Sequence, residues 1–315
     1  MSAHWQAQRE GGDRFSIGLA VRVALCFGRG VARACLLPVT LYYFFRRGAE
    51  RRASRDYLSH VLERRARSWE VLKHLYYFAV TLTDRIYLLA RGERDFEIDV
   101  HGIDCLQHYI AQGNGVLLVG SHQGSFEVLR TLGARCPQVP LRVLLDKQKT
   151  PAITQLLEAL APDVGEAVID VSQGGAGITL AAAETLRAGG MVALLADRGR
   201  AHESLRRVDF LGEPAPFPVG PWLLAHALQV PVMLCFGMYR GGKRYSLTFE
   251  PFAERVDIPR EDRQRALDHV LRRYAQRLEY YARQEPYNWF NFYDFWQQDI
   301  AQDSAPTRID SMREA

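Results

Sequence analysis

The sequence has few cysteines and no short spacing that would pair them. Only five of its 315 residues are cysteine, they lie far apart, and none forms a CxxC pair. This argues against a small disulfide-stabilised domain and favours a reduced, cytosol-facing protein. Internal repeats, low-complexity tracts and long Gly/Ser linkers are also missing. With 48% hydrophobic residues, the chain can bury a substantial core.

A strong excess of charge is missing as well. The net charge is +4, from 40 basic and 36 acidic residues, which alone does not indicate a nucleic-acid-binding protein. There is no HExxH motif and no cysteine cluster suited to zinc. The stretch SQGGAG at 172–177 lacks the lysine of a P-loop and the glycine spacing of a dinucleotide site, so we expect a flexible connection there.

One long apolar segment stands out, at residues 15–45, and three arginines interrupt it. Arg22, Arg29 and Arg33 fall on one stripe of a helix. A free transmembrane helix would bury these charges at considerable cost, whereas an in-plane helix, or a membrane helix whose arginine face packs on protein, accommodates them. Arg22 also argues against a signal peptide. The arginine-rich segment 46–67 follows directly and suits an anionic membrane leaflet, although a solvated helix face has the same charge pattern.

The rest of the chain predicts an α/β protein. Residues 1–90 are expected to be helical, with a kink at Pro38. From about residue 95, short apolar strands alternate with helices, which is typical of a mostly parallel central sheet with flanking helices, and 230–252 is a candidate terminal hairpin. We therefore expect an N-terminal membrane-associated helical region (1–92), an α/β domain (93–300) and a disordered tail (301–315). The aromatic run at 287–296 is expected mainly to pack in the core.

The stretch GVLLVGSHQGSFEVLR at 115–130 contains the strongest candidate for chemistry. A buried strand ends at Gly120, His122 follows it, and Glu127 is expected in the first turn of the next helix. A carboxylate that reaches the imidazole would fix its tautomer and make it a general base. Histidine stands where a hydrolase elbow needs serine, so no covalent intermediate is implied. The main-chain N–H groups of Gly124 and Ser125 are candidate oxyanion donors. A turn histidine and a helix-capping glutamate would give the same pattern.

Two more expected strands end in polar residues. Asp146, Lys147 and Gln148 follow one of them, and Asp197 and Arg198 follow the other. In such sheets, ligands bind beyond the carboxyl ends of the strands, so these groups should converge with His122. Asp197 and Arg198 would either fix a loop as an ion pair or orient and bind an anionic group.

The motif SHQGSFE at 121–127 resembles the His-x4-acid motif of the glycerolipid acyltransferase superfamily, in the glutamate form of the lipid A late acyltransferases. The block ADRGRAHESLRRVDFLGEPAPFPVGPWLLAHALQVPVML resembles a second block of that branch, and the similarity spans about residues 15–298. The ending YNWFNFYDFW looks more like acyltransferases associated with aryl-polyene or xanthomonadin-type lipids. One departure is LLDKQKTPAITQLLEAL, where lipid A enzymes commonly have an arginine-asparagine pattern.

The resemblance implies a membrane-associated O-acyltransferase at the cytoplasmic side of a bacterial inner membrane. His122 would be the base and Glu127 its partner. Asp197, Arg198, Phe210 and Gly212 would shape the pocket, and Lys147 would serve an anionic donor or acceptor. The donor would be an acyl thioester on acyl carrier protein or coenzyme A, and the acceptor a hydroxyl of a lipid or glycolipid. No metal or bound cofactor and no nucleic acid would be involved. A thioester or ester hydrolase, and a non-catalytic lipid-binding protein on the same scaffold, remain alternatives.

Overall fold

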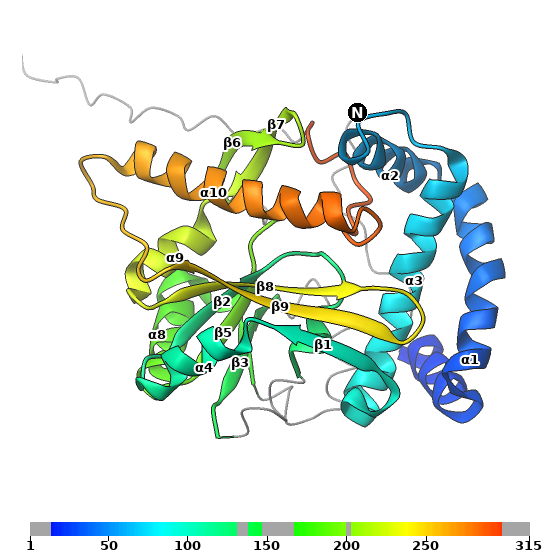
Figure 1. Cartoon of the computed structure of the whole chain (residues 1–315), viewed down its shortest axis with the longest axis horizontal. Coiled ribbons are helices and arrows are strands. Elements are labelled where there is room, and N and C mark those ends of the chain that lie inside the picture. Colours follow the sequence, from blue (N-terminus) through cyan, green and yellow to red (C-terminus); the bar gives the residue numbers. More distant parts are fainter. Residues whose placement is uncertain (1–13, 131–137, 147–166, 200–202, 298–315) are drawn as a thin grey trace, which may run out of the picture.

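The computed structural model describes residues 14–130, 138–146, 167–199 and 203–297. The expected disordered tail at 301–315 lies outside these ranges. A central sheet is covered by helices on both faces, and three N-terminal helices stand beside one end of it (Figure 1). The expected α/β class is confirmed.

The central sheet has seven strands and is mostly parallel. In order across the sheet, they are β1 (Glu97–His101), β9 (Arg244–Ala253), β8 (Val232–Tyr239), β2 (Val116–Gly120), β5 (Met191–Leu195), β3 (Leu141–Leu145) and β4 (Val168–Asp170). The five strands from β8 to β4 run parallel to one another. β9 pairs antiparallel with β8, so the expected terminal hairpin is confirmed, and β1 runs parallel to β9.

Both faces of the sheet are buried, which explains why β2 and β5 are continuous apolar runs. Leu117 and Val119 of β2 face one hydrophobic core, while Val116 and Leu118 face the other. The first core also includes residues of α8 (Gly174–Arg187), α9 (Gly220–Leu228) and α10 (Arg263–Gln284). The second includes residues of α3 (Ser68–Arg91) and α4 (Ile103–Ala111).

Shorter elements complete the fold. They are the 3-10 helices η2 (Gly92–Asp95), η3 (Phe126–Arg130) and η4 (Val171–Gln173), and a separate hairpin of β6 (Leu205–Phe210) and β7 (Glu213–Pro218). The hairpin turn places Leu211 and Gly212 at positive φ, 54° and 89°, which favours glycine at the second position.

The N-terminal region is helical, as expected, in α1 (Arg14–Arg46), α2 (Gly48–Val61) and α3. α1 is interrupted at Gly28, whose φ of 77° lies outside the range of a right-handed α-helix. Pro38, in contrast, lies within the helical segment. The sequence did not predict the break at Gly28, which lies ten residues before Pro38, and a kink at Pro38 stays a prediction. α2 and α3 also contribute Tyr57, Leu58 and Val71 to the same core as the sheet.

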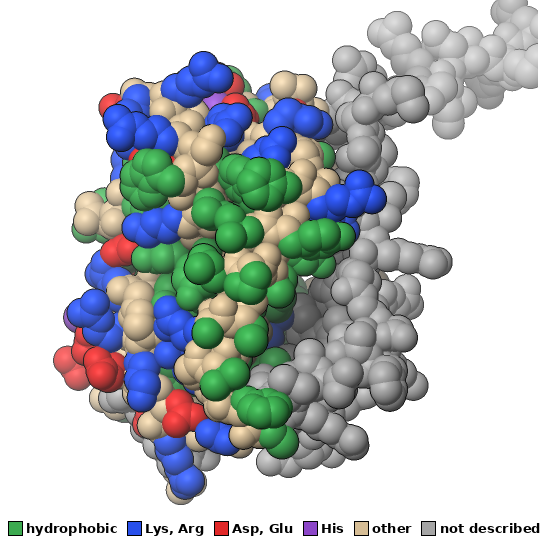
Figure 2. Space-filling model, turned by 90° about the vertical axis from the view of Figure 1, so that its right-hand side faces the viewer, with side chains coloured by type: hydrophobic (Ala, Val, Ile, Leu, Met, Phe, Trp, Pro, Cys, Tyr) green, Lys and Arg blue, Asp and Glu red, His purple; other side chains and the backbone are tan. Residues whose placement is uncertain are grey.

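Two of the three arginines of the α1 stripe bind protein. Arg29 binds Asp84 of α3 and the main-chain oxygen of Gly242, and Arg33 binds Gly242 and the Tyr239 hydroxyl. The segment Leu25–Arg46 is long and apolar enough to cross a membrane by length and composition. Hydrophobic side chains gather over α1 and α3, with basic side chains around them (Figure 2). These exposed residues are Phe27, Val31, Leu37, Val39, Leu41, Tyr42, Tyr43, Phe45, Trp69, Phe78 and Leu82.

Candidate active site

His122 and Asp197 meet because the two strands that precede them are neighbours in register. Gly120 at the end of β2 pairs with Leu195 at the end of β5, so each side chain follows its strand by two residues. His122 Nδ1 lies 2.8 Å from Asp197 Oδ1. The main-chain N–H of His122 also donates to both carboxylate oxygens, at 3.1 Å each. The expected convergence at this edge of the sheet is confirmed for these two residues.

The contact with Asp197 fixes the tautomer of His122. An ionised carboxylate only accepts hydrogen bonds, so Nδ1 carries the proton and Nε2 keeps its lone pair. Asp197 is fully buried, whereas about 35% of the His122 side chain is exposed. The arrangement therefore presents a neutral imidazole with a basic nitrogen at an accessible position.

Burial and charge both act on the pKa values of this pair. Burial of the imidazole, helped by the Arg198 charge, lowers the pKa of His122 against the opposing attraction of Asp197. For Asp197, burial alone would raise the pKa, but His122, Arg198 and the Trp289 indole together hold it well below the ordinary value. At neutral pH the site thus contains an ionised aspartate beside an unprotonated histidine.

Glu127 lies in the first turn of η3, as expected, but it points to other partners. Its Oε1 lies 2.6 Å from Nε of Arg85 on α3, and its Oε2 accepts a hydrogen bond from the Ser125 hydroxyl at 3.0 Å. Among the described residues, no hydrogen bond or ion pair joins Glu127 to His122. The expectation that Glu127 reaches the imidazole across the bend is therefore wrong for this structure, and Asp197 takes that position. Whether Glu127 serves catalysis stays a prediction.

The two amides predicted to stabilise an oxyanion are already used. Gly124 N–H donates to the main-chain oxygen of Asn288 and Ser125 N–H to that of Gly237, both at 2.8 Å. The loop that carries His122 is held against β8 and the C-terminal segment, so these donors face protein. The prediction of Gly124 and Ser125 as oxyanion donors is wrong for this reason.

Arg198 is the cation that lies beside the pair. Its Nε is 3.9 Å from Asp197 Oδ2, within ion-pair range but too far for a hydrogen bond. A terminal nitrogen of its guanidinium donates to the main-chain oxygen of Phe290, and its plane lies over the Tyr293 ring at 5.5 Å. The two residues were expected either to form an ion pair or to orient and bind an anionic group. Each alternative is partly met, since they lie within ion-pair distance and Asp197 orients His122.

The C-terminal segment 288–290 belongs to the site, which the sequence did not reveal. Trp289 Nε1 donates to Asp197 Oδ2 at 2.9 Å, and Phe290 N–H donates to the main-chain oxygen of His122 at 3.0 Å. The aromatic run does pack in the core, as expected. Its density of tryptophan and asparagine was the available signal, but only the fold brings it to His122.

Phe210 and Gly212, two other predicted site residues, lie away from His122 and Asp197 in the described structure. Phe210 is fully buried and packs against the Trp289 ring, with ring centroids 5.1 Å apart. Gly212 lies in the β6–β7 turn, and an added Cβ there would meet no atom within 4 Å. Lys147 and the neighbouring Gln148 lie outside the described residues.

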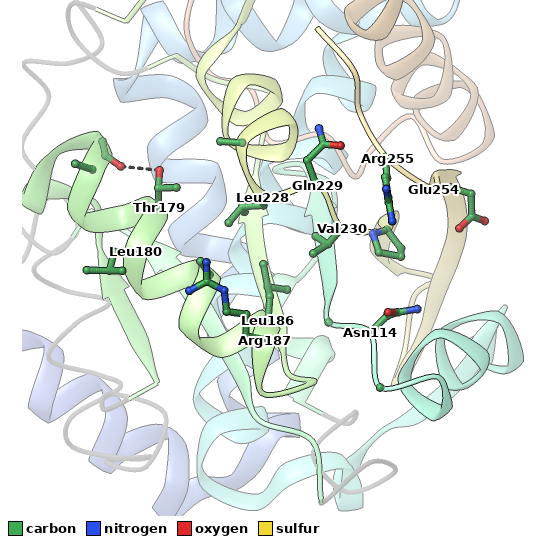
Figure 3. Close-up of a pocket in the computed structure, with 17 residues that line it drawn as sticks. Asn114, Thr179, Leu180, Leu186, Arg187, Leu228, Gln229, Val230, Glu254 and Arg255 are labelled. Atoms are coloured by element: carbon green, nitrogen blue, oxygen red, sulfur yellow. Dashed lines mark hydrogen bonds between the residues drawn. The ribbon is translucent and has the colours of Figure 1, made fainter.

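A cavity of about 880 Å³ lies at the opposite edge of the sheet (Figure 3). Its lining includes Asn114 just before β2, Arg187 just before β5, and Arg255 after β9. Asn114 and Arg187 precede the amino ends of β2 and β5, and Arg255 follows β9, which runs antiparallel to β8, whereas His122 and Asp197 follow the carboxyl ends of β2 and β5. None of the predicted site residues that the structure describes lines this cavity.

The family model for bacterial lipid A biosynthesis acyltransferases matches residues 14–298. The chain belongs to this family. It is therefore an acyltransferase that acts on lipid, and the match covers the N-terminal helices, the sheet and the C-terminal aromatic segment of this acyltransferase. No curated protein matches the chain.

Proposed function

We propose that this acyltransferase moves an acyl group from a thioester to a hydroxyl of a lipid or glycolipid, with His122 as the general base. The observation that carries the proposal is the 2.8 Å contact between His122 Nδ1 and the buried Asp197 carboxylate, which leaves Nε2 unprotonated on an accessible ring. Burying the charge of Asp197 is costly, and its contact with His122 serves to orient a base. A protein that only binds lipid would not need such a base.

The reaction follows from the position of that lone pair. Nε2 of His122 takes the proton of the acceptor hydroxyl while the hydroxyl oxygen attacks the thioester carbonyl carbon. Asp197 stabilises the imidazolium that forms, without itself taking the proton. The tetrahedral intermediate then breaks its C–S bond, and His122 returns the proton to the departing thiolate. The products are an ester and a free thiol.

Arg198 is the group we assign to the developing oxyanion. Its Nε is buried and has no hydrogen-bond acceptor among the described residues, and its charge is close enough to lower the pKa of His122. A cation fixed in a largely buried site stabilises negative charge more strongly than it would in water. This replaces the backbone amides of Gly124 and Ser125 in that role.

Glu127 acts, in this proposal, on the charge balance beside His122. It neutralises Arg85, which otherwise adds to the positive charge that opposes imidazolium formation. Both side chains are mostly buried, at 19% exposed for Arg85 and 13% for Glu127, so the pair is poorly screened by solvent. Glu127 thereby supports the base without touching it.

We also propose that the exposed apolar surface of α1 and α3 attaches the acyltransferase to the inner membrane from the cytoplasmic side. Several apolar residues of α1, such as Phe27, Tyr42 and Phe45, are exposed, while Arg29 and Arg33 bind protein. Arginines such as Arg46, Arg47, Arg51 and Arg52 follow and would meet anionic headgroups. Acyl carrier protein or coenzyme A would deliver the acyl group at this membrane surface.

The proposal is tested with labelled acyl thioesters of both carriers, membranes and total lipid extract. Label should enter a lipid with the wild-type protein and not with His122→Ala, and isolation of that lipid names the acceptor. Release of free labelled acid without acceptor would instead indicate a hydrolase. Equal transfer by both proteins would exclude His122 as the base.

A further inference from the structure

Three donors converge on the Asp197 carboxylate, two from His122 and one from the C-terminal segment. Oδ1 accepts from the His122 ring, and both oxygens accept from its main-chain N–H. Oδ2 also accepts from the indole of Trp289 at 2.9 Å. Asp197 and Trp289 are both fully buried, so the carboxylate cannot replace a lost donor with water.

A competing partner lies on the same side of the carboxylate as the indole. Arg198 Nε is 3.9 Å from Oδ2, is buried, and has no hydrogen-bond acceptor among the described residues. A charge-assisted bond between a guanidinium and a carboxylate is stronger than a neutral one. Without the indole, a small rotation of the Asp197 side chain would satisfy Arg198 and carry Oδ1 away from His122.

Trp289 is itself held from several directions, so its indole is a rigid donor. Its main-chain oxygen lies 2.9 Å from Nε2 of His74 on α3. Its ring packs edge-on against Tyr57 of α2 and Phe295, with centroids 5.0 and 4.9 Å away. The N-terminal helices therefore fix the residue that contacts Asp197.

We propose that Trp289 is a positioning residue, which keeps the Asp197 carboxylate turned toward His122 and away from Arg198. This rests on the proposed role of His122 as base, and it extends that role to a residue that touches neither substrate nor the reacting atoms. The N-terminal helices that hold Trp289 thus act on the reaction centre through its indole N–H.

The test is Trp289→Phe, which removes the donor and keeps an aromatic ring. Trp222→Phe is the matched control, because Trp222 is also fully buried and its indole nitrogen has no hydrogen-bond partner in the described part of the chain. Histidine-selective ¹⁵N NMR, assigned with His122→Gln, reports the His122 tautomer and pKa independently of any activity. We expect Trp289→Phe to lower the His122 pKa by roughly half a unit or more and to reduce kcat about 10-fold, with a smaller change in KM.

Trp222→Phe should leave the His122 pKa and tautomer as in the wild type. If Trp289→Phe matches this control in the His122 titration, Trp289 has only a packing role and the inference is wrong. Should Trp289→Phe fail to fold, β-(3-benzothienyl)alanine at position 289 keeps the ring shape, replaces N–H by sulfur and should give the same His122 shift. If Trp289→Phe shifts the His122 titration but the wild-type protein transfers no acyl group, the positioning role is retained and the proposed function is rejected.

Discussion

Arg29 of α1 donates two hydrogen bonds to the buried carboxylate of Asp84 on α3, at 2.7 and 2.6 Å. Asp84 is fully buried and also accepts a hydrogen bond from the Tyr245 hydroxyl. An arginine inside an apolar segment is thereby explained by protein packing: the helix turns this face to α3 and leaves its apolar face uncovered.

This pairing predicts a large stability loss when the cation is removed alone. Arg29→Met should lower the free energy of unfolding by about 3–5 kcal/mol, because it leaves a buried, uncompensated charge. Adding Asp84→Asn should restore most of that loss. Arg47→Met breaks the exposed pair with Glu50 and should cost under about 1 kcal/mol. Denaturation in detergent compares the four proteins, and equal losses for Arg29→Met and Arg47→Met would contradict the pairing.

His74 predicts a pH-dependent stability. Its pKa is lowered from 6.5 to about 4 by burial, while Ser54 and the main-chain oxygen of Trp289 hold its two ring nitrogens. Because the folded pKa is below the unfolded one, the neutral form stabilises the fold above pH 6.5, and this stabilisation is lost as pH falls from 6.5 toward 4. The loss is at most about 3 kcal/mol.

The check is the free energy of unfolding between pH 7 and pH 4.5 for the wild type and for His74→Gln. Glutamine can still donate to Trp289 and does not titrate, so the pH slope should be smaller in the variant. Parallel slopes for the two proteins would show that His74 does not titrate with unfolding.

The contact between Gly237 of β8 and the loop that carries His122 leaves no space for a side chain. A Cβ at Gly237 would lie 2.2 Å from the main-chain oxygen of Ser125. Gly237→Ala should therefore displace the loop, cost about 1–3 kcal/mol of stability and reduce kcat about 10-fold or more. Gly175→Ala is the control, since its Cβ would meet no atom within 4 Å. If both variants keep full activity, the loop does not depend on this packing.

The sequence predicted the features that depend on local periodicity. The apolar runs of β2 and β5 indicated buried parallel strands, and their shared edge brought His122 and Asp197 together. The arginine stripe left two readings open, and Arg29 and Arg33 do bind protein, as one of them required. These outcomes follow from residue spacing along single elements and from one general property of parallel sheets.

The errors concern the direction of side chains and contacts between distant segments. Spacing placed Glu127 one turn from His122, but η3 is a 3-10 helix, and the glutamate turns to Arg85 on α3. The amides of Gly124 and Ser125 seemed free because their acceptors, Asn288 and Gly237, lie more than 100 residues away. The break at Gly28 depends on a single φ, which no periodicity shows.

The most direct test of the account is the acyl-transfer rate of Asp197→Asn beside that of Glu127→Gln, each measured against pH. Asp197→Asn keeps the shape but removes the charge that orients His122 and stabilises its imidazolium, so kcat should fall about 100-fold or more. Glu127→Gln should reduce kcat less than Asp197→Asn does, because Glu127 acts on His122 only through Arg85. In the wild type, activity should persist below pH 6.5, because the pKa of His122 is lowered. Near-normal kcat in Asp197→Asn, with loss of activity in Glu127→Gln, would contradict the account and return the role to Glu127.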